Sequence, residues 1–158
     1  MIRLRPYRDS DADIILSWQR DEKVFYQWCA GMLGAYPPSR QSFDALGTLM
    51  RFTALDEEQV LGFFTLRNPG ESQDEVRFGY VIVDPQKRGK GYGAEMLRLG
   101  LVFARSVYRA KRATLGVFEN NTAAYRCYRA VGFREKGETE MYPVMGEEWV
   151  CREMFLDL

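Results

Sequence analysis

The spacing of apolar side chains divides the start of the chain into one strand and two helices. Residues 2–5 alternate apolar and charged side chains, as expected of a half-buried strand. Ile14, Ile15 and Trp18 recur at helical spacing, which predicts a short helix that buries them on one side. A second short helix is expected over residues 22–29, before a loop rich in glycine and proline.

The rest of the chain is richer in strand patterns. Residues 49–55 and 60–66 carry β-prone side chains on either side of a polar turn, which predicts a hairpin. Residues 76–83 are almost continuously apolar, as in a central strand. The remaining pattern predicts, in chain order, a helix over 94–108, a strand over 113–118, a helix over 121–131 and final strands over 133–142 and 148–156. This mixed order predicts one α/β domain over residues 1–158, with helices packed on a mixed sheet.

A loop rich in glycine and basic residues follows the predicted central strand. Residues 88–93 read Arg-Gly-Lys-Gly-Tyr-Gly and lead directly into a predicted helix. Glycine lets the backbone turn sharply and approach a ligand, and the free N–H groups of a helix start attract phosphate. The loop therefore predicts a site for a pyrophosphate or a similar anion, although a solvated basic turn has the same composition.

Two other phosphate-binding motifs were weighed for this loop. A P-loop is excluded, because the chain has no GxxxxGK followed by Ser or Thr. Gly89, Gly91 and Ala94 do fit the GxGxxA fingerprint of dinucleotide-binding proteins, and Glu119 follows the next strand, where a ribose-binding acid would lie. Against this, residues 84–88 separate the strand from the first glycine, and the chain offers no second mononucleotide half. A dinucleotide site stays open as an alternative.

Two motifs in the second half of the chain point to a known family. Residues 88–93 match the pattern (Gln/Arg)-x-x-Gly-x-(Gly/Ala). The pattern Asn-x-x-Ala-x-x-x-Tyr-x-x-x-Gly-Phe is matched by Asn121, Ala124, Tyr128, Gly132 and Phe133. These are the two signatures of the GNAT superfamily of N-acetyltransferases, which the segment 76–133 resembles. They stand in that family's order, separated by one helix and one strand.

The resemblance implies a fold, a cosubstrate and a binding mode. The fold would be a mixed, mostly antiparallel sheet of about seven strands flanked by about four helices. The cosubstrate would be acetyl-CoA, and no metal is implied. The pyrophosphate would be bound through the backbone amides of Arg88, Gly89, Lys90, Gly91, Tyr92 and Gly93. The pantetheine arm would pair with the backbone of Val81, Ile82 and Val83 as an extra strand, and would contact Asn121.

Acetyl transfer to an amine requires three kinds of help from the protein. The amine must be neutral, which costs about 4.6 kcal/mol at pH 7 for a lysine-like amine and about 1.4 kcal/mol for an α-amine. The oxyanion of the thioester needs a donor, and a backbone N–H freed at a bulge or splay of the central strand is the expected one. The leaving thiolate needs a proton or a hydrogen bond.

Two residues are the candidates for catalysis. Tyr128 occupies the family's general-acid position, and because the pKa of tyrosine exceeds that of a thiol, we expect a hydrogen bond to the thiolate rather than complete proton transfer. Glu75 stands thirteen residues before Arg88, where the histone-acetylating branch places its catalytic glutamate. It could act as the base directly or through water, or be an exposed carboxylate at a strand end. Gly116 stands where the branch that acetylates ribosomal N-termini carries an acid.

Four aromatic residues surround the first two predicted helices. In proteins of this family that region commonly forms the acceptor pocket, which Trp18, Tyr26, Trp28 and Tyr36 would then line. The same residues are also what an ordinary core requires.

Composition removes several other classes of function. The chain has no histidine, which excludes Ser-His and Cys-His nucleophile pairs and HExxH zinc sites. Lys and Arg number 22, as do Asp and Glu, so no overall field collects nucleic acid or anionic membrane. The three cysteines, Cys29, Cys127 and Cys151, form no CxxC pair, which favours a reducing compartment over a disulfide framework.

The sequence thus predicts a cytoplasmic, acetyl-CoA-dependent N-acetyltransferase. Its partner would be the primary amine of a small molecule or a peptide, with neither nucleic acid nor membrane involved, and a homodimer is compatible with this interpretation. Two alternatives stay open, a non-catalytic acyl-CoA-binding module and a dinucleotide-binding protein.

Overall fold

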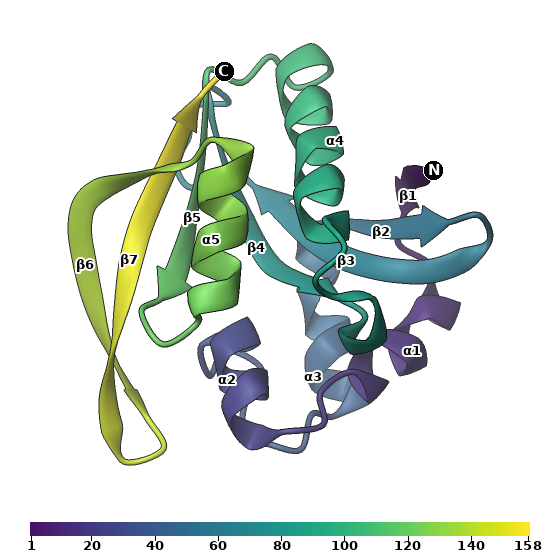
Figure 1. Cartoon of the computed structure of the whole chain (residues 1–158), viewed down its shortest axis with the longest axis vertical. Coiled ribbons are helices and arrows are strands. Elements are labelled where there is room, and N and C mark those ends of the chain that lie inside the picture. The colour runs from purple at the N-terminus through teal and green to yellow at the C-terminus, as the bar shows by residue number, and fades with distance from the viewer.

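A computed structural model describes residues 1–158 as strands and helices in mixed order (Figure 1). In chain order the elements are β1 (Ile2–Pro6), α1 (Ala12–Ser17), α2 (Glu22–Cys29), α3 (Arg40–Asp44), β2 (Met50–Asp56), β3 (Gln59–Arg67), β4 (Glu75–Val83), α4 (Tyr92–Ser106), β5 (Arg112–Phe118), α5 (Thr122–Val131), β6 (Arg134–Val144) and β7 (Glu147–Asp157). Every predicted strand is confirmed, as are four predicted helices. None of the helices is long and apolar enough to cross a membrane.

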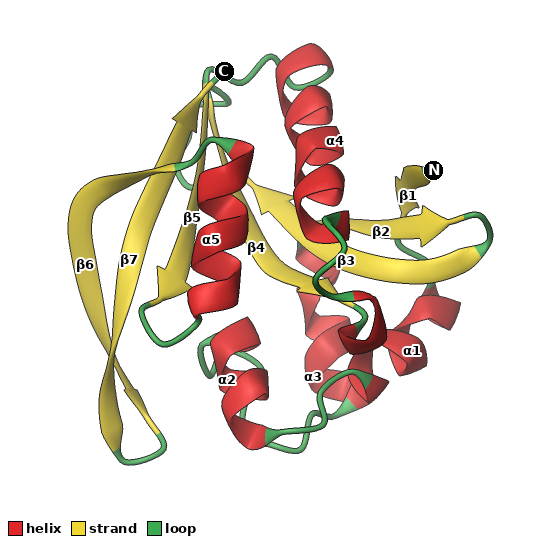
Figure 2. Ribbon diagram, in the orientation of Figure 1, coloured by secondary structure: helices red, strands yellow, loops and turns green.

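All seven strands belong to one sheet, in the order β1-β2-β3-β4-β5-β7-β6. Neighbouring strands are antiparallel except β4 and β5, which are parallel. The parallel pairing is short, since only residues 75–77 of β4 pair with residues 112–114 of β5. Beyond that point the two strands separate, and the centre of the sheet opens (Figure 2).

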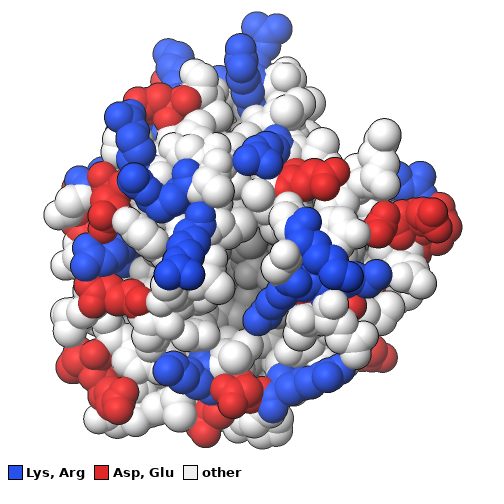
Figure 3. Space-filling model, in the orientation of Figure 1, with Lys and Arg blue, Asp and Glu red and all other residues white.

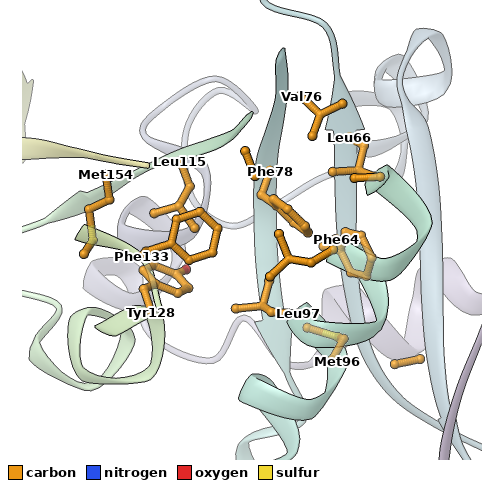
Figure 4. Close-up of a cluster of buried hydrophobic side chains, with 14 of the residues drawn as sticks. Phe64, Leu66, Val76, Phe78, Met96, Leu97, Leu115, Tyr128, Phe133 and Met154 are labelled. Carbon is orange, nitrogen blue, oxygen red and sulfur yellow. The ribbon is translucent and has the colours of Figure 1, made fainter. Parts of the chain in front are cut away.

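Helices cover both faces of the sheet and bury two separate cores. Helices α4 and α5 pack on one face, where Phe64, Phe78 and Leu97 belong to the larger buried cluster. Figure 4 shows Phe78 at the centre of this cluster, between Phe64 and Phe133. Helices α1, α2 and α3 pack on the other face around a second cluster. The opening between β4 and β5 therefore connects the two faces of the molecule.

The structure differs from the sequence prediction in two elements near the N-terminus. Helix α3 was not predicted, because its five residues are too few to show an apolar period. Its start is fixed locally, since the Ser39 hydroxyl accepts a hydrogen bond from the Ser42 N–H at 3.1 Å. The prediction that Ile14 is buried beside Ile15 and Trp18 was also wrong. Ile14 is 42% exposed, because α1 turns Ala12 and Ile15 into the core and Ile14 towards the surface.

Candidate active site

A cavity of about 540 Å³ occupies the opening between β4 and β5. Its walls come from both faces of the sheet, including Leu115 and Tyr128 on the side of α4 and α5 and Trp28 on the side of α2. Ten of the predicted site residues line it together: Val81, Ile82, Val83, Arg88, Gly89, Gly91, Tyr92, Gly93, Asn121 and Tyr128. Two ligands could thus meet in this cavity, one entering from the side of α4 and α5 and the other from the side of α2.

The glycine loop forms one end of the cavity. Gly89 and Gly91 have φ angles of +77° and +84°, which are unfavourable for other residues, and Gly91 is the N-cap of α4. No atom lies within 4 Å of the position that a Cβ would take at either glycine, so the backbone faces open space. The N–H groups of the first helical turn, which have no partner within the helix, are therefore accessible to an anion.

All charged residues that line the cavity are basic. They are Lys87 and Arg88 from the glycine loop and Arg126 from α5. Figure 3 shows Lys and Arg side chains on both sides of a central hollow. Lys90, which was also predicted to bind the ligand, does not line the cavity. The positive charge and the free N–H groups together suit a ligand with several negative charges, such as a pyrophosphate.

Tyr128 lies deep in the cavity wall on α5. It is 7% exposed and packs edge-on against Phe133, with ring centroids 6.3 Å apart. No hydrogen bond joins its hydroxyl to another side chain or to the backbone, although the residue is buried. Burial raises the pKa of Tyr128 well above its ordinary value, and the neighbouring Cys127 adds to the shift. The hydroxyl is therefore protonated at neutral pH and is a hydrogen-bond donor without a protein acceptor.

The strand β4 is irregular where it lines the cavity. Thr65 of β3 pairs with Gly79 and Phe63 pairs with Ile82, so that one residue of β3 faces two residues of β4. This is a β-bulge at Tyr80 and Val81. Tyr80 has a φ of +51°, although it is not a glycine. The sequence analysis expected such a bulge or splay on this strand, and both are present.

Asn121 and Gly93 stand at the starts of α5 and α4, next to the cavity. The Asn121 side chain caps α5, accepting a hydrogen bond from the Ala124 N–H at 3.3 Å, so its position at the cavity has a local structural cause. At Gly93, a Cβ would lie 3.3 Å from the Cys127 sulfur, which is tighter than ordinary contact. The glycine therefore permits the start of α4 to approach α5.

Glu75 is not brought to the cavity by the structure. It is the first residue of β4, on the side where β4 pairs with β5, and its carbonyl accepts a hydrogen bond from the Asn68 side chain at 3.0 Å. The cavity begins only at Phe78. Glu75 therefore lies outside the cavity that Tyr128 lines, and its role as the base stays a prediction.

Gly116, the position without an acid, lies in the cavity wall beside an ion pair. Arg77 and Glu153 form two hydrogen bonds of 2.7 and 2.8 Å across β5 at this residue. A Cβ on Gly116 would lie 3.0 Å from the Arg77 guanidinium and 2.9 Å from the Cys151 sulfur. The glycine therefore leaves room for the ion pair to pass over the strand.

Of the four aromatic candidates for an acceptor pocket, only Trp28 lines the cavity. Trp18 is 4% exposed and belongs to the core beneath α1 and α2. Tyr26 uses its hydroxyl to accept a hydrogen bond from the Tyr36 N–H at 3.1 Å, which makes this pair part of the local structure. The interpretation as core packing fits three of the four residues.

Arg126 is a basic lining residue that was not predicted from the sequence. It lies inside the second motif, two residues before Tyr128. The pattern of this helix does not indicate which of its basic residues faces a ligand. No group of three or more His, Cys, Asp or Glu side chains that could hold a metal ion occurs in the structure.

The opened mixed sheet and the glycine loop before α4 define an α/β protein with a basic cavity between two diverging strands. The chain belongs to the acetyltransferase (GNAT) family, whose model matches residues 6–133.

Relatives agree with this membership but differ in the molecules they are named for. The chain is 30% identical over 95 residues to a spermine/spermidine N(1)-acetyltransferase of Bacillus subtilis, a match that covers 60% of each protein. It is 36% identical over 143 residues to a mycothiol acetyltransferase of Salinispora tropica, covering 84% of this chain and 44% of the relative. The chain thus spans about 60% or less of the length of these two relatives.

The fold itself is shared over nearly the whole chain. A spermidine N-acetyltransferase of Vibrio cholerae, solved with CoA and spermine, superposes with a TM-score of 0.83 at 19% identity, covering 99% of this chain and 95% of that one. At this identity the likeness establishes the fold.

Proposed function

We propose that this protein is an acetyl-CoA-dependent N-acetyltransferase that transfers the acetyl group directly to a primary amine. The observation that carries the proposal is the cavity, which joins a basic glycine loop to a buried tyrosine hydroxyl without a protein partner. Membership of the family and relatives named as N-acetyltransferases support it.

The pyrophosphate end of the cosubstrate is assigned to residues 88–93. The accessible N–H groups at the start of α4 and the charges of Lys87, Arg88 and Arg126 suit a diphosphate. The pantetheine arm is assigned to the backbone of residues 81–83, because β4 has lost its partner strand there and can pair with an extended ligand. Asn121, which lies at the same wall, is assigned to the pantetheine region.

The chemical step is then an attack of the neutral amine nitrogen on the thioester carbonyl carbon. A backbone N–H on β4 stabilises the oxyanion that forms. The bond from carbon to sulfur breaks as the oxyanion collapses, and the sulfur leaves as a thiolate. The proton that the amine nitrogen loses passes to water, and the thiolate takes up a proton from water to become the free thiol. Tyr128 donates a hydrogen bond to this thiolate, since its raised pKa keeps the hydroxyl protonated and makes complete proton transfer unfavourable.

The acceptor is proposed to be the amine of a small molecule or a peptide. Relatives named for spermine and spermidine support the small-molecule class. The amine would approach from the face of α2, where Trp28 and Gly116 line the far end of the cavity. Three free cysteines support the cytoplasm as the compartment, whereas the homodimer stays a prediction that sedimentation would test.

Release of free thiol from acetyl-CoA tests the proposal. The purified protein is incubated with acetyl-CoA and a panel of polyamines, amino sugars, amino acids and peptides. Amine-dependent thiol release, with an acetylated product of matching mass, is expected for at least one class.

The alternatives give other results in the same experiments. An acyl-CoA-binding module would be stabilised against heat by acetyl-CoA but would release no thiol with any amine. A dinucleotide-binding protein would be stabilised by NAD and not by acetyl-CoA.

A further inference from the structure

Tyr80 adopts a backbone conformation that its own side chain disfavours. Its φ of +51° lies in the left-handed region, which is unfavourable for a residue other than glycine. The residue stands at the bulge of β4, within the wall of the cavity. A conformation of this kind persists only where the surrounding structure holds it.

The contact that holds it comes from α2, on the other face of the sheet. The Trp28 indole Nε1–H donates a hydrogen bond to the Tyr80 carbonyl oxygen at 2.9 Å. The two rings also pack edge-on, with centroids 5.8 Å apart. The bulge interrupts the register with β3 at this residue, and Trp28 supplies a hydrogen bond to its carbonyl from outside the sheet.

The direction of the Tyr80 carbonyl determines the direction of the next N–H. In a trans peptide the C=O and the following N–H point to opposite sides, so the Val81 N–H points away from Trp28. The strand after the bulge is consistent with this direction. The Asp84 N–H donates to Leu61 of β3 at 2.8 Å, and because successive N–H groups alternate along a regular strand, the Val83 N–H points towards β5. The ladder between β4 and β5 has already ended there.

We propose that Trp28 is a positioning residue, which pins the Tyr80 carbonyl so that the Val81 N–H is aimed into the opening as the oxyanion donor. The inference rests on the proposed acetyl transfer, and it assigns Trp28 no contact with the reacting atoms. Without the indole N–H, the Tyr80 carbonyl loses its partner and the strained peptide is free to rotate. The donor would then point elsewhere in a fraction of the molecules, and catalysis would fall in proportion.

The test compares two tryptophans that each donate one indole hydrogen bond. Trp28→Phe keeps an aromatic ring and removes the donor. Trp149→Phe is the matched control, because the Trp149 indole donates to Glu147 at 3.3 Å in the β6–β7 hairpin, away from the cavity. We expect kcat to fall about tenfold in Trp28→Phe, with KM for acetyl-CoA within about twofold of the native protein, and neither to change in Trp149→Phe.

A second variant and a second readout separate positioning from packing. Site-specific replacement of Trp28 by 3-benzothienylalanine keeps the volume of the side chain and removes only the N–H. The ¹⁵N–¹H signal of Val81 should shift in this variant, and kcat should fall as in Trp28→Phe. Unchanged kcat in both variants overturns the proposal. So does a fall in kcat that is matched by a rise in KM, or one that the benzothienyl variant does not reproduce.

Failure of the proposed function would be distinguishable from failure of this inference. If the native protein releases no thiol with any amine, acetyl transfer is wrong whatever Trp28 does. If the native protein turns over and the Trp28 variants turn over equally fast, only the positioning role is wrong.

Discussion

The two ends of β4 belong to one strand and have opposite surroundings. At its start, residues 75–77 pair in register with β5, and Arg77 is tied to β7 by the bidentate ion pair with Glu153. At its end, residues 78–83 have no partner on the side of β5, contain a strained bulge and line a cavity. The end of β4 that is paired with β5 therefore supports the end that lines the cavity, and we call these the closed end and the open end. A sheet can be opened at its centre only if the strands are firmly held where they still meet.

Removing one hydroxyl at the open end should have the largest effect on activity. We expect Tyr128→Phe to lower kcat about a hundredfold, because the leaving thiolate loses its hydrogen-bond donor. Stability should hardly change, since the hydroxyl makes no hydrogen bond within the protein and the ring that packs on Phe133 is kept. Steady-state thiol release and a urea titration measure the two quantities. Undiminished turnover would remove the tyrosine from the mechanism.

Breaking the ion pair at the closed end should instead affect stability. Arg77→Met leaves the Glu153 carboxylate, which is 18% exposed, without its cation, and we expect a loss of about 2 kcal/mol in the free energy of unfolding. A shift of the urea midpoint measures it. As a control, Arg77→Met combined with Glu153→Leu should recover most of the loss, because no unpaired charge is left. A fall in kcat of more than tenfold in the folded Arg77→Met protein, with an unchanged urea midpoint, would contradict the division between the two ends.

The glycine loop offers a sharper version of the same comparison. In Gly91→Ala the added methyl meets no atom within 4 Å, but the φ of +84° is unfavourable for alanine and should cost about 1 kcal/mol of stability. We also expect KM for acetyl-CoA to rise several-fold. The loop would shift to relieve the unfavourable φ, and its N–H groups would then no longer point at the pyrophosphate. Gly137→Ala is the matched control, since Gly137 has a φ of +85° and equally open space in β6, away from the cavity. It should lose similar stability with unchanged KM.

How much of this could be predicted from the sequence depends on distance along the chain. The strands and the glycine loop are local, because apolar periods and glycine spacing report on neighbouring residues. The strands were confirmed, whereas anion binding by the loop stays a prediction. Two motifs predicted that residues 88–93 and Asn121 bind one ligand, and all of these residues except Lys90 line one cavity. Arg126 gave no such signal, and Trp28 was one of four aromatic residues among which the sequence could not choose. Their place depends on which face of a helix meets the opening in the sheet, which is a tertiary property.

The ion pair and the bulge depend on contacts between residues that are far apart in the sequence, which local patterns do not predict. Arg77 and Glu153 are 76 residues apart, and their contact depends on the absence of a side chain at Gly116. In the sequence this glycine stands where one branch of the family carries an acid. In the structure, the absence of its side chain leaves room for the Arg77 guanidinium. A bulge was expected on β4, but its position at Tyr80 depends on how β3 pairs with the strand.

Glu75 should show the smallest effect, and it tests whether the two ends of β4 are truly separate. It stands on the closed side, before the cavity begins, so Glu75→Gln is expected to leave kcat and its pH profile within about twofold of the native protein. The amide keeps the size of the side chain, so that any change reports on charge or proton transfer. The pH dependence of kcat/KM with a reactive amine is the measurement. A loss of activity above tenfold, together with loss of the basic limb of the profile, would make Glu75 the base after all and would extend the working part of β4 to its first residue.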